Sequence, residues 1–508
     1  MRSSTGHFPA ACLTVLGLLL VRGADADCSG SNWPKNCAFN GDNPYDWEFV
    51  APDCSVANPN HFSITQASDW DEINNPAYDV FCVQPGDYRN WNNGAILTLS
   101  AKGTESSPRW ILLYDPDNPS ATEHPVHLDV AQQAIMPHFE ITGGEYWHLY
   151  RMTVKGYSLG SGNVTGTRGI RYSHLLIEEG EKSAFPRVVG ANGDYVFQYI
   201  VQRNIVPGPN GTDRSGFYIE SCDFQPCTIV RNEIINPAGD AIQVAGARYH
   251  GGLRIDSNEM YMTDARRTNC DTGLPDPGGL CATNEEMIVF KDPRTEPAEP
   301  SYITNNVIHH SYYFDGKSCC TSGPQYAPAI NIGSGLAGAL SNIIIENNII
   351  FESSQGIEIA NNGVRGARNI SVKRNLLYRI DALQDPLKDD VALRTHLGDG
   401  HIEHYNVMVD GEIGLMTSSR YAKDHQCNVA IDAGDVKYFS TRGIWNSNFA
   451  YGLTAVKPGT GYTDHGTPQN SRNSTMCITT HWITEPATYC IPYGKVSPVS
   501  PHYGCAPQ

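Results

Sequence analysis

The chain has 508 residues and a formal net charge of −18 at pH 7, with 36 Lys and Arg against 54 Asp and Glu. Such an acidic chain without a basic stripe is a poor binder of nucleic acid or of an anionic membrane. It can still bind a polyanion, because a local basic strip or a bound cation reverses the field within a cleft.

Residues 1–26 have the pattern of a secretory signal peptide. Arg2 provides a positive start, "ACLTVLGLLLV" is the apolar stretch, and Ala24 and Ala26 fit a small-x-small cleavage site. The apolar stretch is too short to span a bilayer, and no second one follows. We therefore expect a protein that is secreted to the extracellular space and has no membrane span.

The cysteines and glycosylation motifs agree with export. Removal of Cys12 with the signal leaves 14 of the 15 cysteines, and an even number in an exported chain favours disulfides. Cys222 with Cys227, and Cys270 with Cys281, are close pairs that suit one loop each. Four acceptor triplets predict N-glycosylation, at Asn163, Asn210, Asn369 and Asn473.

Residues 27–95 are expected to form an N-terminal cap. They contain "ASDWDEINN", which predicts a short helix, and "YDVFCVQPGDYR", which predicts a strand ending in a Pro-Gly turn. A cap is needed where the chain continues into open-ended β-structure, because unpaired strand edges promote aggregation.

From residue 96 to residue 435 a short phrase recurs: an apolar strand, an Asn, a second strand, a Gly and a third strand. A unit this small cannot bury its own apolar face, so its repetition predicts a solenoid, here a parallel β-helix. The Asn is expected at a turn, in a hydrogen-bonded column along the axis. Arg151 and His174 fall near this position in earlier units. The column would contain Asn204, Asn232, Asn258, Asn306, Asn348, Asn375 and Asn406.

Residues 436–508 lack the phrase and are rich in Gly, Pro, Ser, Thr and Cys. We expect them to form a C-terminal segment that is tied by disulfides and packed on the solenoid. No Pro- or Ser-rich linker interrupts the repeat, so one long domain, and a monomer, are expected.

The repeat resembles the right-handed parallel β-helix superfamily typified by pectate lyases, over residues 95–435. This resemblance implies an all-β, right-handed parallel β-helix. It also implies a function among those of the superfamily, which are mostly polysaccharide lyases, glycoside hydrolases and uronate epimerases. These proteins bind an extended sugar chain along a groove on one face, although a fold alone does not determine function.

Two intervals of the Asn column are long: 48 residues from Asn258 to Asn306, and 42 from Asn306 to Asn348. Insertions on neighbouring coils of a solenoid commonly build the walls of one binding site. Because side chains alternate along a strand, one strip of polar residues is expected to face outward next to these two insertions. With Ile288 and Phe290 inward, Met287, Val289 and Lys291 are expected to face out. The whole strip is Glu220, Asp240, Gln243, Glu285, Lys291, Asn331, Glu358 and Arg394.

The strand from Glu285 to Lys291 carries the sharpest candidate chemistry. A Lys on a rigid strand among carboxylates can act as a base if its pKa falls. The strand resembles the Glu-to-Lys strand of the alginate lyase and chondroitinase B family. That resemblance implies Lys291 as the base and Glu285 or Glu286, with Asp240, as acidic residues that hold calcium. Glu286 lies an odd five residues from Lys291, so both can face the groove only across a bulge.

Other candidates surround this strand. The family's assisting Arg corresponds to Arg248, Arg294 or Arg394, on different coils. His310, beside His309, is a candidate acid or sugar contact, and Tyr249 with His250 is a candidate acid–base pair or sugar platform. The residues expected to contact substrate are Gln243, Arg248, Tyr249, His250, Asn331 and Arg394. An outward Lys–Glu pair can equally be a solvated ion pair of little energetic worth.

Three functions remain open. The first is a lyase that cleaves an acidic, uronate-containing polysaccharide by β-elimination, with calcium as its one expected cofactor. The second is a glycoside hydrolase that uses paired carboxylates such as Asp240 and Glu285 on consecutive coils. The third is a non-catalytic protein that binds a glycan or cell wall through the same strip.

Overall fold

The structure is a computed structural model that describes part of the chain between residues 51 and 496. The described residues are 51–119, 123–156, 163–178, 185–189, 193–203, 215–222, 226–237, 239–248, 252–263, 286–291, 299–311, 328–334, 340–359, 367–380, 391–395, 398–409, 413–417, 424–426, 428–431, 435–438, 444–446, 448–451, 455–456, 462–464, 472–480 and 487–496.

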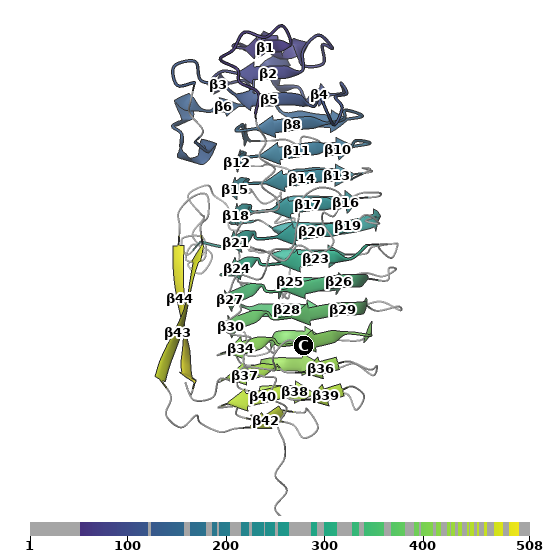
Figure 1. Ribbon diagram of the computed structural model, residues 1–508, viewed down its shortest axis with the longest axis vertical. Coiled ribbons are helices and arrows are strands. Elements are labelled where there is room, and N and C mark those ends of the chain that lie inside the picture. Colours follow the sequence, from purple (N-terminus) through teal and green to yellow (C-terminus); the bar gives the residue numbers. More distant parts are fainter. Residues whose placement is uncertain are drawn as a thin grey trace, which may run out of the picture.

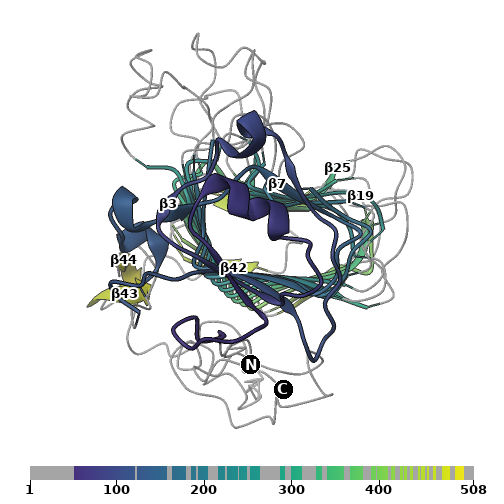
Figure 2. The same cartoon turned by 90° about the horizontal axis from the view of Figure 1, so that it is seen from above.

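Three long parallel sheets run side by side along the molecule (Figure 1). Sheet A begins at β1 (His61–Ile64) and ends at β39 (Ile444–Asn446), sheet B runs from β3 (Gly86–Asp87) to β42 (Tyr462–Asp464), and sheet C from β4 (Leu97–Leu99) to β41 (Ala455–Val456). Most neighbours within a sheet are three strands apart in sequence, so each coil contributes one strand to each sheet. Seen along the axis, the coils superpose (Figure 2). This is the right-handed parallel β-helix that the repeat predicted.

The sheets extend beyond residues 96–435 at both ends. β1, β2 (Val80–Val83) and β3 precede residue 96, and β39 to β42 follow residue 435. These coils lack the Asn phrase but still pair in register, because parallel pairing needs only extended backbone. The short helix expected near the start is η2 (Ala67–Glu72), a 3₁₀-helix. After the last coil, β43 (Arg472–Thr480) and β44 (Ala487–Val496) form an antiparallel hairpin beside sheet B (Figure 1).

The core consists of apolar residues that stack in register from coil to coil. In sheet C, Ile242, Ile288 and Ile330 are Cα partners on successive strands, and Ile357 and Leu393 continue the column. All five are at most 1% exposed. Because side chains alternate along a strand, the residues between these positions point outward.

An asparagine column runs through the turn between sheets A and B. Each Asn donates from Nδ2 to a main-chain carbonyl at 2.7–3.0 Å, and each except the last, Asn428, also donates to the Oδ1 of the Asn one coil further on at 2.9–3.0 Å. The members are Asn232, Asn258, Asn306, Asn348, Asn375, Asn406 and Asn428, each at most 1% exposed.

Three details of the column differ from expectation. Asn428 is a further member, and Asn204 lies outside the described residues; the place before Asn232 belongs to Ile200, whose N–H donates to Asn232 Oδ1 at 2.9 Å. The left-handed conformation falls on the residue before the column, as at Arg231 (φ 54°), and not on the Asn. Arg151 and His174, expected near the column, have this left-handed geometry too.

Two disulfides lie among the cysteines whose side chains the structure describes. Cys222–Cys227 confirms one predicted pair, and Cys54–Cys82 ties the start of the described chain to β2. Cys270 and Cys281 lie outside the described residues, as does Asn210. Of the other glycosylation candidates, Asn163 begins β10 (Asn163–Thr165), Asn369 is exposed in β29 (Ala367–Lys373), and Asn473 lies in β43. In the described part of the chain, no helix is long and apolar enough to cross a membrane.

His124, which is buried, and His148, which is part-buried, lie in surroundings that disfavour a protonated ring. His124 Nδ1 accepts from the Val126 N–H at 3.1 Å while Nε2 lies 2.9 Å from the Tyr199 carbonyl, so the ring is neutral with its proton on Nε2. Burial lowers the pKa of His124 to about 3, and burial with the nearby Arg171 charge lowers that of His148 to about 3.

We expect stability to fall as the pH drops below 6.5. Unfolded histidine has a pKa near 6.5, so each ring's contribution is complete above that value and is lost as unfolded chains take up protons. At pH 4.5 each histidine would cost about 2–3 kcal/mol. Urea unfolding at pH 7.5, 6.5, 5.5 and 4.5 measures the slope. Replacing His124 and His148 by Gln should reduce it, and an unchanged slope in the double variant would contradict this assignment.

Candidate functional site

The outer face of sheet C carries the polar strip expected from the sequence. Its strands here are β16 (Phe217–Ser221), β19 (Ile242–Arg248), β22 (Ile288–Lys291), β25 (Pro328–Ser334), β28 (Gln355–Ile359) and β31 (Val391–Thr395). Their outward residues in register are Tyr218, Gln243, Val289, Asn331, Glu358 and Arg394. Coils stack ~4.8 Å apart, so this column spans several sugar-sized steps.

At the centre of the strip, two carboxylates, an ammonium and an amide converge. Lys291 Nζ lies 3.2 Å from Asp240 Oδ2 and 3.7 Å from Glu286 Oε2. Asn331 Nδ2 donates to Glu286 Oε1 at 3.0 Å. The Asp240 side chain has no exposed surface, that of Glu286 is 7% exposed and that of Lys291 is 23% exposed. Four residues from three coils thus form one partly accessible group, which we call the Lys291 cluster.

The two acidic residues reach this cluster from turns before the strands. Asp240 lies two residues before β19 and Glu286 two residues before β22. The Glu286 N–H donates to Asp240 Oδ1 at 3.2 Å, which fixes one turn above the other. Because Glu286 precedes its strand, strand alternation does not govern its direction, and it meets Lys291 across an odd offset.

The bulge in this region is on the next strand. β22 and β25 pair Phe290 with Ile332, but Lys291 pairs with Ser334, so Gly333 is the extra residue, with φ 107°. The expectation of a bulge between Glu286 and Lys291 was therefore wrong in its position. The expected outward direction of Met287 was also wrong, because Met287 has no exposed surface and packs in the core.

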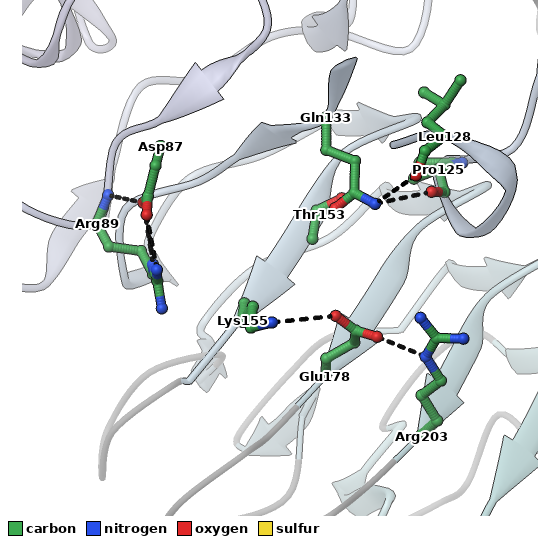
Figure 3. Close-up of polar contacts among 9 residues, drawn as sticks. All are labelled: Asp87, Arg89, Pro125, Leu128, Gln133, Thr153, Lys155, Glu178 and Arg203. Atoms are coloured by element: carbon green, nitrogen blue, oxygen red, sulfur yellow. Dashed lines mark hydrogen bonds and ion pairs between the residues drawn. The ribbon is translucent and has the colours of Figure 1, made fainter. Parts of the chain in front are cut away.

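The charge balance separates this cluster from an ordinary surface ion pair. On sheet B, Glu178 Oε1 and Oε2 lie 2.5 Å from Arg203 Nε and 3.7 Å from Lys155 Nζ, so two cations flank one carboxylate (Figure 3). In the Lys291 cluster, by contrast, one ammonium lies 3.2 Å from one buried carboxylate and 3.7 Å from another. Coulomb attraction at such distances favours the ionised forms.

The oxygen atoms of the cluster are of the kind that a hard cation prefers as ligands. Asp240 and Glu286 offer carboxylates, and Asn331 Oδ1 accepts no hydrogen bond from the described residues. Calcium prefers such oxygens but takes six to eight of them. Within the described ranges no group of three or more His, Cys, Asp or Glu can hold a metal ion. Glu285, the other candidate ligand, lies outside them. Calcium binding stays a prediction.

Residues flanking the cluster along the strip are paired with one another. Arg187 Nη2 donates to Glu220 Oε1 at 2.8 Å and its guanidinium lies 5.2 Å from the Tyr218 ring centroid. Ser215 Oγ donates to Gln243 Oε1 at 2.7 Å.

Further along, Arg394 Nη1 lies 3.9 Å from Glu358 Oε1. The described strip therefore has one arginine–carboxylate pair on each side of the cluster.

Sequence reasoning missed Tyr218 and Arg187. Burial, and the nearby Glu220 carboxylate, raise the pKa of Tyr218, so its hydroxyl stays protonated. The signal was present in the sequence, since Tyr218 stands between the inward Phe217 and Ile219. Aromatic residues are usually assigned to the core, which hides an outward Tyr in such a strand.

Of the other predicted residues, His310 is described with its side chain and does not join the cluster. His310 lies at the end of a sheet B strand, where its Nε2 is 3.1 Å from Glu352 Oε2. Arg248 is the last residue of β19, with its backbone paired to Ser221. Glu285, Tyr249, His250 and Arg294 lie outside the described residues.

No protein-family model matches the chain, and no curated protein sequence matches it. Among solved structures it is similar to a PL6 family alginate lyase, AlyGC, with a TM-score of 0.46 and 11% identity. The match covers 88% of this chain but only 57% of that one. A mannuronic acid specific polysaccharide family 6 lyase from human gut microbiota has a TM-score of 0.38 at 10% identity, covering 81% of this chain and 92% of that one. The periplasmic alginate epimerase AlgG has 0.33 at 11%, covering 81% and 79%. At such identities the similarity concerns the fold.

Proposed function

We propose that this protein is a secreted carbohydrate-active enzyme that cleaves an acidic, uronate-containing polysaccharide by β-elimination. The observation that carries the proposal is the Lys291 cluster: a strand-borne lysine beside two buried carboxylates on the outer face of a solenoid. A lysine at a fixed place on a rigid strand is suited to proton transfer, which requires a precisely positioned base.

In this reaction Lys291, in its neutral form, takes the proton on the carbon next to the uronate carboxyl. The electron pair forms a carbon–carbon double bond, and the bond from the neighbouring carbon to the glycosidic oxygen breaks. That oxygen must gain a proton. Tyr218 faces outward on the same strip and stays protonated, which supports a role as donor.

The carboxylates explain how the lysine's charge would be controlled. Beside the ionised carboxylates of Asp240 and Glu286, Lys291 favours its ammonium form, which cannot accept a proton. A divalent cation on the oxygens of Asp240, Glu286 and Asn331 would neutralise the carboxylates and the substrate carboxyl. Neutralising the carboxylates would lower the pKa of Lys291, so that its neutral form would be populated at a lower pH. This supports a cation requirement.

The flanking pairs support binding of an extended chain. Arg187 and Arg394 each lie three coils from β22, about 14 Å in either direction along the strip. Their guanidinium groups are suited to planar carboxylates. A polysaccharide lying parallel to the axis would meet cations on both sides of the cleavage point.

The test is digestion of acidic and neutral polysaccharides by the full chain, with and without chelator. Products are read for ultraviolet-absorbing unsaturated ends and for new reducing ends. We expect unsaturated ends from a uronate polymer, and a loss of activity with chelator that added calcium restores. Saturated ends alone would exclude the lyase. Chelator-resistant unsaturated ends would exclude only the cation requirement.

A glycoside hydrolase is the second candidate, supported by the proximity of two carboxylates on consecutive coils. Asp240 and Glu286 are joined through the hydrogen bond from the Glu286 N–H to Asp240 Oδ1, at 3.2 Å. Hydrolysis needs two carboxyl groups about 5–10 Å apart across one bond. Binding of a glycan array without any product would instead favour a non-catalytic binding protein.

A further inference from the structure

A second titratable group lies on sheet B, apart from the Lys291 cluster. It is built by the ends of β21 (Glu259–Tyr261), β24 (Val307–His309) and β27 (Ile349–Ser353), which are neighbours in that sheet. His309 Nε2 lies 3.1 Å from Glu259 Oε1, and His310 Nε2 lies 3.1 Å from Glu352 Oε2. The two imidazoles face each other, Nδ1 to Nδ1, at 2.6 Å.

This geometry fixes the number of protons on the two rings. Each Nε2 faces a carboxylate oxygen and carries a proton when that carboxylate is ionised. Between the two Nδ1 atoms there is room for one proton, donated by one ring and accepted by the other. The pair thus holds three protons and one positive charge. A fourth proton would turn two N–H groups toward each other, and loss of the third would leave two lone pairs in contact.

Packing holds the His309 ring in place. It is 3% exposed and stacks between the Tyr261 ring, with centroids 4.7 Å apart, and the Phe351 ring, at 4.8 Å, each inclined by 9°. His310 is more accessible, with its side chain 20% exposed, and its backbone is left-handed at φ 53°. Burial, and the charge of His310, lower the pKa of His309 well below its usual 6.5.

Charged groups around the pair favour the singly charged state. Glu233, on β18 (Glu233–Ile235), is the Cα partner of Glu259, and Tyr261 Oη donates to Glu233 Oε1 at 3.1 Å. Arg379, on β30 (Leu376–Ile380), donates to Glu352 at 3.2 Å, and His310 lowers the pKa of Glu352. Among the described residues of β18, β21, β24, β27 and β30, these are the charged and titratable groups around the imidazole pair, together with the Tyr378 hydroxyl.

The connectivity relates this pair to the Lys291 cluster. β21 leads through residues 264–285 to Glu286 and β22, and β24 leads through residues 312–327 to β25, which carries Asn331. These are the connections that make two intervals of the Asn column long. The stacked rings of Tyr261 and His309 join the two strand ends from which those connections start.

We propose that His309 and His310 form a pH-operated latch between the ends of β21 and β24, closed while the rings share one proton and opened by a second. Opening separates the rings and releases the ends of both strands. The latch does not require the reaction proposed for the Lys291 cluster, because the contacts that form it all lie on sheet B.

Hydrogen exchange of the full-length protein between pH 8 and pH 4.5, corrected for the intrinsic pH dependence of exchange, tests the latch. We expect protection of residues 259–263 and 307–311 to fall at least tenfold as the pH decreases, while residues 242–245 keep their protection. In His310→Gln the difference between the segments should no longer depend on pH. The matched control is His404→Gln, since His404 also pairs with a carboxylate, Asp424, at 3.1 Å, and should behave as the wild type.

Nitrogen NMR of ¹⁵N-histidine-labelled protein provides a second readout that does not depend on the variants' stability. At pH 7.5 we expect one neutral ring protonated on Nε2, one doubly protonated ring, and a far-downfield proton between them. Two neutral rings with separate proton signals would overturn the proposal. So would a wild-type pH dependence of exchange in His310→Gln.

Discussion

Replacing Lys291 by Met is expected to lower the cleavage rate about 10³-fold, within the range for loss of a general base. Met keeps most of the side-chain volume but cannot accept a proton. The measurement is the initial rate of appearance of unsaturated ends on the best substrate of the panel, at saturating concentration. A variant that cleaves at the wild-type rate would exclude Lys291 as the base.

The same substitution should also destabilise the fold. Asp240 has no exposed surface, and the substitution removes the ammonium that lies 3.2 Å from its Oδ2. Breaking a buried pair from one side costs ~3–5 kcal/mol. The double variant Lys291→Met with Asp240→Asn should recover part of that stability and none of the activity. Lys102→Met is a matched control, because Lys102 pairs with Glu145 at 2.7 Å but is 63% exposed, and should change stability little.

Replacing Asn306 by Ala is expected to cost about 3–5 kcal/mol of unfolding free energy, because buried groups left without partners cost ~1–3 kcal/mol each. Asn306 Oδ1 accepts from the main-chain N–H of Asn258 at 3.0 Å, and Nδ2 donates to the carbonyl of Ile255 at 3.0 Å. Both partners are buried within the coil. Denaturant unfolding, followed by circular dichroism and by intrinsic fluorescence, measures the change.

Asn347→Ala is the control for this effect. Asn347 precedes Asn348 of the column and takes the left-handed backbone at φ 57°, but its side chain is outside the column. Its loss should cost no more than the ~1–2 kcal/mol of placing Ala in that conformation. Equal destabilisation by the two variants would show that turn conformation, and not the hydrogen-bonded column, sets the stability of the coils.

The fold and much of the strip could be predicted because both depend on periodicity. Alternation along a strand places Gln243, Asn331 and Arg394 outward whatever their neighbours are, and parallel stacking then brings them into one column. The Asn column could be predicted from the sequence, because its members make the same kind of hydrogen bonds and so require the same residue type. Cys222–Cys227 was readable from its short spacing.

The remaining features depend on positions where periodicity stops. Glu286 precedes its strand, so its partnership with Lys291 follows from a turn and not from alternation. Met287 turns into the core at the same boundary. His310 follows the last residue of β24. The direction of its side chain is set by a left-handed backbone conformation, which no pattern in the sequence predicts. The outward position of Tyr218 was missed because aromatic residues are usually assigned to the core.

In the asparagine column, the rise of each coil along the axis does not depend on the number of residues in that coil. Successive members are 26, 48, 42, 27, 31 and 22 residues apart, yet the side-chain bonds between them are all 2.9–3.0 Å. Each coil therefore rises by the same step whether its connections are short or long. New segments can be acquired or lost at the connections over evolutionary time without shifting the residues above and below. A solenoid of this kind can change the surface formed by its connections while its axial spacing is preserved.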